Sequence, residues 1–286
     1  MAFNLQTFKT RTLTAIVFAV VMLSGLLINQ WTFFLLFTII HFGCWIEYQK
    51  LIGLIDKDYR QINSFHKYSI MLLGWMFMLW MTNHAYRINR IELQGIGWIC
   101  GLIIAILFLG KEIVLKKHLN IKLIGYSLLG LIYISLSWGL MIDLFSINSN
   151  LLDNAAWVYP MLIIISIWIN DTMAYIVGSF IGKTPLSKIS PKKTWEGTVG
   201  GIILSVAVIG FISYLYTKNI NANILIIALI SAVAGTFGDL LESKIKRMAN
   251  VKDSGNFMPG HGGFLDRFDS LLIATPFVWL FIKLVF

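Results

Sequence analysis

The sequence predicts an all-α integral membrane protein with about nine transmembrane helices, its N-terminus in the cytoplasm and its C-terminus outside. Hydrophobic residues make up 57% of the 286 residues and charged residues only 13%, about half of what a soluble protein carries. The mean hydropathy is +0.76. Long uncharged runs recur along the chain, and a bilayer core is crossed by about 20 helical residues. These three observations favour a membrane protein over a soluble one.

Each uncharged run predicts one helix, except the first, which is long enough for two with a hinge at Asn29 and Gln30. Five helices are expected in an N-terminal region, 1–150, that carries few motifs. Four are expected in a catalytic region, 151–286, and the two regions are expected to form one integrated unit. The predicted helices lie near 12–29, 31–49, 68–86, 94–110, 123–142, 156–179, 197–217, 222–241 and 270–286.

The net charge is +9, and the placement of the basic residues predicts the orientation. With the N-terminus in the cytoplasm, 19 of the 23 Lys and Arg residues fall in cytoplasmic segments, as the positive-inside rule requires. The other four are Arg87, Arg90, Lys218 and Lys283. Such a basic face attracts nucleotides and the headgroups of anionic membrane lipids. Nucleic acid is not expected as a partner, because the basic residues are dispersed among short membrane loops.

Residues 243–269 carry the densest chemistry of the chain. Their sequence, SKIKRMANVKDSGNFMPGHGGFLDRFD, sets basic residues, aspartates, a histidine and glycines between two uncharged runs. Lys and Arg neutralise phosphate, the backbone N–H groups of glycines approach it closely, and carboxylates hold a bridging metal. The pattern predicts a phosphate-handling site at the bilayer surface. Candidate catalytic residues are Asp239, Asp266, Lys246 and Arg267, and candidate substrate-binding residues are Ser243, Arg247, Lys252, Asp253, His261, Gly262 and Gly263. For His261, a base, a phosphate donor and a structural hydrogen-bonding group all remain open.

Asp239 and Asp266 bracket this stretch and are the candidate metal ligands. A carboxylate within an apolar span costs about 2.5–3.5 kcal/mol unless it is paired or solvated, which favours a function for Asp239. The structural alternative is an ion pair with Lys246 or Arg247. A loop that folds back would bring both carboxylates to one Mg²⁺, which takes one or two protein carboxylates and completes its shell with water and phosphate oxygens. Asp269, by contrast, is as well explained as the N-cap of the last helix.

A second candidate segment, SPKKTWEG, runs from Ser190 to Gly197. Ser190 is a plausible N-cap, and Pro191 suits the first position of a helix. Two lysines would then lie on the first turn, where the helix dipole and free N–H groups already favour an anion. An ordinary positive-inside anchor is the alternative. The candidate substrate-binding residues here are Ser190, Lys192, Lys193, Thr194 and Glu196.

Asp171 and Tyr175 share a helical face because they are four residues apart. Together with Asp269 they are candidates for a polar cavity between helices, reached by a metal, a ribose or a headgroup. Alternatively, Asp171 is a structural residue that pairs with a lysine of another span.

The segment from Ser243 to Asp269 closely resembles the signature of the phosphatidate cytidylyltransferases, also called CDP-diacylglycerol synthases. The matching pattern is S-x-I-K-R-x₄-K-D-x-G, followed by P-G-H-G-G-F-x-D-R-F-D. The resemblance extends upstream through SPKKTWEG and the segment from Asp171 to Tyr175, and so covers about 120 C-terminal residues. Met258 is a mild departure, since the family usually has another large aliphatic residue or Phe there. So long a signature is far more specific than a lone glycine-rich loop.

The resemblance implies a nucleotidyltransferase of phospholipid biosynthesis, in which CTP and phosphatidate give CDP-diacylglycerol and pyrophosphate. It implies that Asp239 and Asp266 are the metal pair and that the metal is Mg²⁺, with or without a second cation. It also implies a homodimer in the cell (inner or plasma) membrane, with its active site on the cytoplasmic face.

Two other functions compete with this interpretation. A CTP-dependent polyprenol or lipid kinase would transfer the terminal phosphoryl group and release CDP, but the complete HGGFLDRFD ending favours the cytidylyltransferase. A membrane transporter would use Asp171 and Asp239 to line an ion path. The charges cluster with basic loops on one side of the membrane, which disfavours a transporter.

Overall fold

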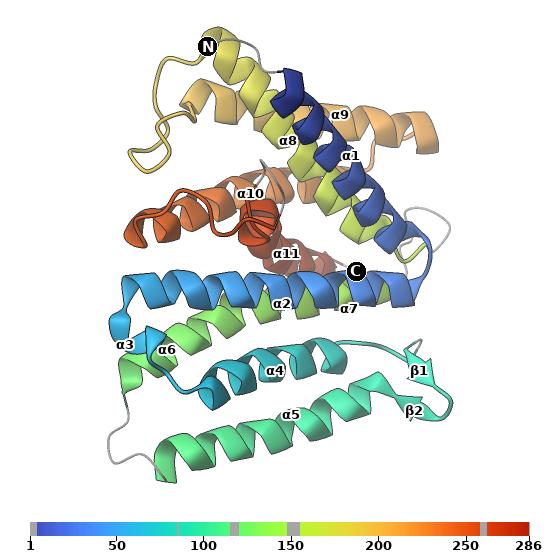
Figure 1. Cartoon of the computed structure of the whole chain (residues 1–286). Coiled ribbons are helices and arrows are strands. Elements are labelled where there is room, and N and C mark those ends of the chain that lie inside the picture. Colours follow the sequence, from blue (N-terminus) through green and yellow to red (C-terminus); the bar gives the residue numbers. More distant parts are fainter. Residues whose placement is uncertain (1–4, 85, 115–119, 148–154, 258–261, 286) are drawn as a thin grey trace. The chain divides into compact units, whose positions relative to one another are not determined.

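The computed structural model describes residues 5–84, 86–114, 120–147, 155–257 and 262–285, and these are almost entirely helical (Figure 1). The contacts group the chain into two units. The first unit comprises Met1–Ile147 and Met248–Arg267, and the second comprises Asn148–Arg247 and Phe268–Phe286. The segment after α10 therefore belongs with the N-terminal helices, although about 100 residues of sequence separate them.

The helices of the first unit begin with α1 (Leu5–Leu27), α2 (Gln30–Ile55), the short α3 (Lys57–Arg60) and α4 (Ser64–Trp80). A small antiparallel hairpin of β1 (Arg87–Ile88) and β2 (Ile91–Glu92) leads into α5 (Leu93–Leu109), which the π-helical η1 (Gly110–Val114) extends. After that, α6 (Ile121–Gly130), the π-helical η2 (Leu131–Leu136) and α7 (Ser137–Ser146) follow without interruption.

The break between α1 and α2 lies at the predicted hinge. The Asn29 side chain accepts hydrogen bonds from the backbone N–H groups of Trp31 (2.8 Å) and Thr32 (3.0 Å). The Thr32 hydroxyl in turn accepts one from the Asn29 backbone N–H at 3.2 Å, which completes a capping box. Asn29 thus starts a new helix inside an uncharged run of sequence.

Aromatic side chains form the core of the first unit where α2 meets α7. Phe33, Phe37 and Trp138 are fully buried. The ring of Phe33 stacks on Phe145 with 4.1 Å between centroids, and Phe37 lies 5.2 Å from Trp138. In Figure 1 the helices of this unit follow one another as layers, α2 beside α7, then α4, then α5, in agreement with their contacts.

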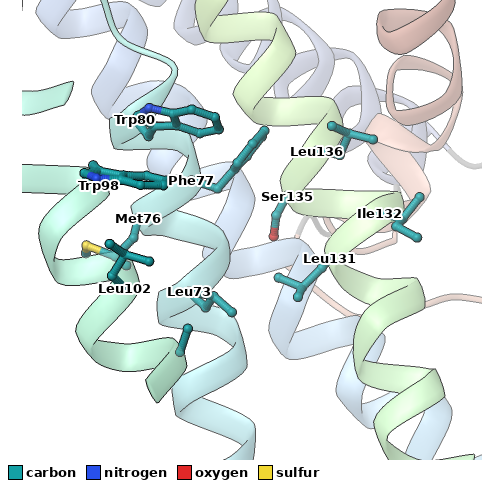
Figure 2. Close-up of a pocket in the computed structure, with 13 residues that line it drawn as sticks. Leu73, Met76, Phe77, Trp80, Trp98, Leu102, Leu131, Ile132, Ser135 and Leu136 are labelled. Atoms are coloured by element: carbon teal, nitrogen blue, oxygen red, sulfur yellow. The ribbon is translucent and has the colours of Figure 1, made fainter. Parts of the chain in front are cut away.

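An apolar cavity of about 400 Å³ lies between α4, α5 and η2 (Figure 2). Its walls include Phe77, Trp80 and Trp98, with Ser135 on the η2 side. The Ser135 hydroxyl accepts a hydrogen bond from Trp45 Nε1 at 2.9 Å and lies 3.1 Å from His41 Nε2. The polar side chain that borders the cavity is therefore already hydrogen-bonded within the helix bundle.

The second unit contains α8 (Val158–Ile181), α9 (Trp195–Thr217), most of α10 (Ala222–Met248) and most of α11 (Leu265–Val285). Glycines bring α8 and α9 together. A Cβ on Gly201 would lie 2.8 Å from the carbonyl oxygen of Asn170, and one on Gly197 would lie 2.7 Å from that of Ala174. Helices in membranes pack closely through such small residues, so α8 and α9 form a closely packed pair.

We expect Gly201→Val to separate α8 from α9, because the new side chain meets backbone atoms that cannot move aside. Overpacking of this kind costs about 1–3 kcal/mol. Thermal unfolding of the purified protein in detergent should show a clearly lower Tm. Gly125→Val is the matched control, since nothing lies within 4 Å of a Cβ at Gly125. An equal Tm for the two variants would contradict the packing of α8 on α9.

The predicted all-α membrane class agrees with the structure apart from the small hairpin, and each of the nine predicted spans overlaps a helical segment, although the span predicted at 68–86 runs past the end of α4 at Trp80. Within the described residues, seven helices are long and apolar enough to cross a membrane. The remaining two segments are shorter: Thr12–Leu27 is a shorter apolar helix and α4 has 17 residues. The chain is an integral membrane protein, while nine crossings and the direction of the termini stay predictions.

Candidate active site

In the second unit, three carboxylates act on one lysine. Lys193 Nζ lies 2.7 Å from Asp239 Oδ2. Burial lowers the pKa of Lys193, but the charge and hydrogen bond of Asp239, with the charges of Asp171 and Asp269, outweigh burial and hold this pKa above its ordinary value. Lys193 is therefore a cation at neutral pH, and the carboxylates around it come from α8, α10 and α11.

The close approach of α10 and α11 places two of these carboxylates. A Cβ on Gly238 would lie 2.9 Å from the Cα of Ser270 and would collide with the carbonyl oxygen of Asp269. Glycine at 238 thus lets the helix that carries Asp239 touch the helix that carries Asp269. The Asp269 side chain is buried, and its Oδ1 accepts a hydrogen bond from the Ser270 backbone N–H at 2.7 Å.

The partner of Asp239 differs from the structural alternative that the sequence offered. Its ion pair is with Lys193, from the loop before α9, and not with a basic residue of its own helix. Lys246 instead pairs with the buried Glu242, one turn away on α10, at 2.5 Å. Asp239 and Lys193 are 46 positions apart, so sequence spacing could not reveal the pair.

The segment before α9 begins its helix later than predicted. Thr194, not Ser190, is the N-cap, and its Oγ1 accepts a hydrogen bond from the Gly197 backbone N–H at 3.1 Å. The prediction of Ser190 as N-cap was wrong because the chain first folds back on itself. The Leu186 N–H donates to the Lys193 carbonyl at 2.7 Å, and the Trp195 N–H donates to the Thr184 carbonyl at 2.9 Å.

Glu196 fastens this loop to the first turn of α9. Its carboxylate accepts hydrogen bonds from the backbone N–H groups of Lys183, at 3.1 Å, and Thr184, at 3.1 Å. Thr194 and Glu196, both predicted to bind substrate, therefore also shape the loop that presents Lys193. The Ser190 carbonyl oxygen accepts a hydrogen bond from the Lys193 N–H at 3.1 Å, and Lys192 is exposed.

In the first unit, the loop before α11 wraps around Asp266. Asp266 Oδ2 accepts hydrogen bonds from the Ser254 N–H, the Ser254 hydroxyl and the Gly263 N–H, each at 2.8 Å. Gly262 adopts φ +84°, a left-handed conformation that glycine takes without strain. The turn at Gly262 and Gly263 thus directs the Gly263 N–H at the Asp266 carboxylate.

Glu47 of α2 is a functional candidate that the sequence analysis did not select. Its carboxylate accepts hydrogen bonds from the Phe264 N–H at 2.9 Å, the Leu265 N–H at 2.9 Å and the Ser254 hydroxyl at 2.6 Å. The sequence held one signal, an acidic residue at the end of a 35-residue uncharged run, where a carboxylate needs donors.

The same contacts explain where the last helix begins. The helix α11 starts at Leu265, because Glu47 satisfies N–H groups at its N-terminus. Asp269 consequently lies inside the helix, and its interpretation as an N-cap was wrong.

The other predicted residues are distributed as follows. On α10, Ser243 is half-buried one turn after Asp239, whereas Arg247 is exposed. The exposed set also contains Lys252, Asp253, Arg267 and, at 78% exposure, Tyr175. His261 lies outside the described residues.

The described part of the chain contains no group of three or more His, Cys, Asp or Glu side chains arranged to hold a metal ion. Asp239 belongs to the second unit and Asp266 to the first, so their predicted pairing as metal ligands stays a prediction.

Comparison with known proteins places these residues in a family context. Residues 9–285 match the model of the cytidylyltransferase family. The chain is 32% identical to the phosphatidate cytidylyltransferase of Bacillus subtilis (strain 168), over 96% of this chain and 98% of that protein. It is 31% identical to the enzyme of the same name from Staphylococcus saprophyticus, over 94% and 96%. A chloroplastic phosphatidate cytidylyltransferase of Arabidopsis thaliana is 45% identical over 40% of this chain and 29% of its own length.

Proposed function

Because the chain belongs to the cytidylyltransferase family, we infer that it is a membrane nucleotidyltransferase that transfers the cytidylyl group of CTP to phosphatidate. The products are CDP-diacylglycerol, for phospholipid synthesis, and pyrophosphate. One observation carries this conclusion: the similarity to proteins named phosphatidate cytidylyltransferase extends over nearly the whole chain. The carboxylates around Lys193 and the glycine-rich turn at Asp266 supply chemistry that suits it.

In this reaction an oxygen of the phosphatidate phosphate attacks the α-phosphorus of CTP. A new P–O bond forms, the bond from the α-phosphorus to the oxygen bridging to the β-phosphorus breaks, and pyrophosphate leaves with that electron pair. Phosphatidate arrives largely ionised, so little proton transfer is needed. The protein must instead position two polyanions and offset their repulsion.

Basic side chains are the proposed means of offsetting that repulsion. Lys193 is held as a cation by the carboxylates around it, and a half-buried ammonium group interacts with phosphate more strongly than an exposed one. The proposed cationic shell consists of Lys192, Lys193, Lys246, Arg247, Lys252 and Arg267.

The second unit supplies carboxylate oxygens for a divalent cation, although no three metal-ligating side chains of the described residues are grouped around one position. The charges of Asp171, Asp239 and Asp269 all act on Lys193. Carboxylate oxygens are the donors that Mg²⁺ prefers, and one or two of them suffice. We propose Asp239 as a ligand, with Asp266 as its partner and with or without a second cation. Bound Mg²⁺ would stabilise negative charge on the triphosphate and the departing pyrophosphate.

The proposed enzyme crosses the cell membrane nine times as a homodimer, with its N-terminus and active site on the cytoplasmic side and its C-terminus outside. Support comes from the 19 of 23 basic residues that this orientation places in the cytoplasm. Soluble CTP would then meet the phosphatidate headgroup at the interface while the acyl chains stay in the bilayer.

A labelling experiment tests the function. Purified protein in detergent is given phosphatidate, Mg²⁺ and CTP labelled on the α-phosphate. Label that moves into a chloroform-soluble lipid, with matching pyrophosphate release, is the expected result. Label that remains in water as CDP while a lipid acceptor is phosphorylated would identify a lipid kinase. No turnover of CTP with any lipid would favour a transporter.

The contribution of Lys193 is testable on its own. We expect Lys193→Ala to raise the apparent KM for CTP or phosphatidate about tenfold, the loss of one charge-assisted contact. Lys188→Ala is the control, because Lys188 is an exposed lysine of the same loop. If KM for both substrates and kcat stay unchanged in Lys193→Ala, the segment serves only as a topology anchor.

A further inference from the structure

Glu47 lies where a carboxylate is stable only if hydrogen-bond donors surround it. It lies in the apolar helix α2 and is only 8% exposed. Burying a carboxylate without partners is unfavourable, and removing the partners of a buried carboxylate is strongly destabilising. Glu47 is satisfied entirely by the loop that follows α10, more than 200 residues later in the sequence.

Both oxygens of Glu47 are used. Oε1 accepts from the Phe264 N–H, and Oε2 accepts from the Leu265 N–H and the Ser254 hydroxyl. The first two donors stand at the N-terminus of α11, where orphan N–H groups and the helix dipole favour a negative charge. Glu47, a residue of α2, thus acts as an N-terminal cap for α11, which is distant in the sequence.

Ser254 connects Glu47 to Asp266. Its hydroxyl lies 2.6 Å from Glu47 Oε2 and 2.8 Å from Asp266 Oδ2, and its backbone N–H also donates to Asp266. The hydroxyl has one proton, which the two carboxylates share, so displacing Glu47 would change the position of the hydroxyl beside Asp266. Through its hydrogen bonds to Ser254 and Phe264, Glu47 ties two parts of the loop to α2.

The packing leaves this arrangement little freedom. A Cβ on Gly255 or on Gly263 would collide with the Glu47 carboxyl group. A Cβ on Gly43, one turn earlier on α2, would collide with the ring of Phe264. The loop is therefore packed closely against Glu47 and against α2 at Gly43.

We propose that Glu47 is a positioning residue for cytidylyl transfer, which holds Asp266 in its working orientation through Ser254 and the N-terminus of α11. The proposal rests on the proposed function for its kinetic consequence. Both oxygens of Glu47 accept hydrogen bonds from the loop, so its proposed role is to position the loop and not to bind substrate. Its effect should fall on turnover and on the order of the loop, and not on the affinity for CTP.

The first variant is Glu47→Gln, which keeps the size of the side chain but turns an amide NH₂ toward N–H donors. Partners that orient a functional ligand typically contribute 10- to 100-fold to activity, so kcat should fall about 10- to 100-fold while KM for CTP changes less than about threefold. Hydrogen exchange of the amides at 262–268 should accelerate about tenfold, since a hydrogen bond to a charged group is lost. Glu92→Gln, in the exposed hairpin, is the control and should match the wild type in both measurements.

A double-mutant cycle separates positioning from general destabilisation. Ser254→Ala removes the bridging hydroxyl and leaves the backbone N–H bond to Asp266. If Glu47 acts through Ser254, the effects of Glu47→Gln and Ser254→Ala on kcat will be strongly non-additive. If Glu47→Gln does not accumulate in the membrane, Ser254→Ala alone must still lower kcat with KM for CTP nearly unchanged.

Several results would overturn the proposal. They are an unchanged kcat with unchanged exchange in Glu47→Gln, an unchanged kcat in Ser254→Ala, or effects that simply add. Exchange that accelerates throughout the chain would also overturn it, because Glu47 would then serve global stability. Failure of the wild type to label lipid would refute the proposed function instead, while the exchange measurement would still report whether Glu47 orders the loop.

Discussion

Asp239→Asn is expected to abolish turnover while the protein remains folded in the membrane. Asparagine keeps the shape of the side chain but removes the charge that pairs with Lys193 at 2.7 Å and that is proposed to bind Mg²⁺. Removing one group that stabilises transition-state charge costs on the order of 10²–10³-fold in kcat. Initial rates of lipid labelling, measured over a Mg²⁺ titration, check this expectation.

A matched substitution gives the comparison for Asp239. Asp58→Asn makes the same chemical change at an exposed aspartate of α3 and should leave the rate unaltered. Thermal unfolding of both variants in detergent reports whether the fold is kept. Near-normal activity of Asp239→Asn across the whole Mg²⁺ titration would show that the metal assignment is wrong.

Asp266→Asn should cause a loss of similar size for a different structural reason. Asp266 Oδ2 accepts three hydrogen bonds, two of them from backbone N–H groups. The amide oxygen of asparagine can accept the same bonds, so the loop should keep its conformation while the charge is lost. Activity should fall on the order of 10²–10³-fold, and hydrogen exchange at 262–268 should stay close to that of the wild type.

Asp266→Ala provides the contrast, because it removes the acceptor as well as the charge. Three donors then lose their partner, at about 1–3 kcal/mol for each one left buried and unsatisfied. We expect inactivity together with rapid exchange of the loop. If Asp266→Asn were as poorly ordered as Asp266→Ala, its inactivity would reflect loop structure and would say nothing of metal binding.

Much of the fold was predictable because the length of an uncharged run is a local property of the sequence. The break at Asn29 agrees with the structure, since a capping residue acts within three positions of itself. The end of α4 at Trp80 and the hairpin after it were missed, because the apolar run continues through residues that turn. The same limit applies to Ser190, whose capping signal is real but is overridden by the pairing of Leu186 with Lys193.

The candidate site, like the fold, could be predicted only in part. The membrane class, the helical segments, the family signature and the residue types of a phosphate site could be predicted, because each depends on composition or on short spacing. The pairing of Asp239 with Lys193, the place of Asp269 inside α11 and the contacts of Glu47 with the loop around Asp266 became visible only in three dimensions. These contacts join residues 46 to 218 positions apart, and a buried carboxylate finds its donors in space rather than along the chain.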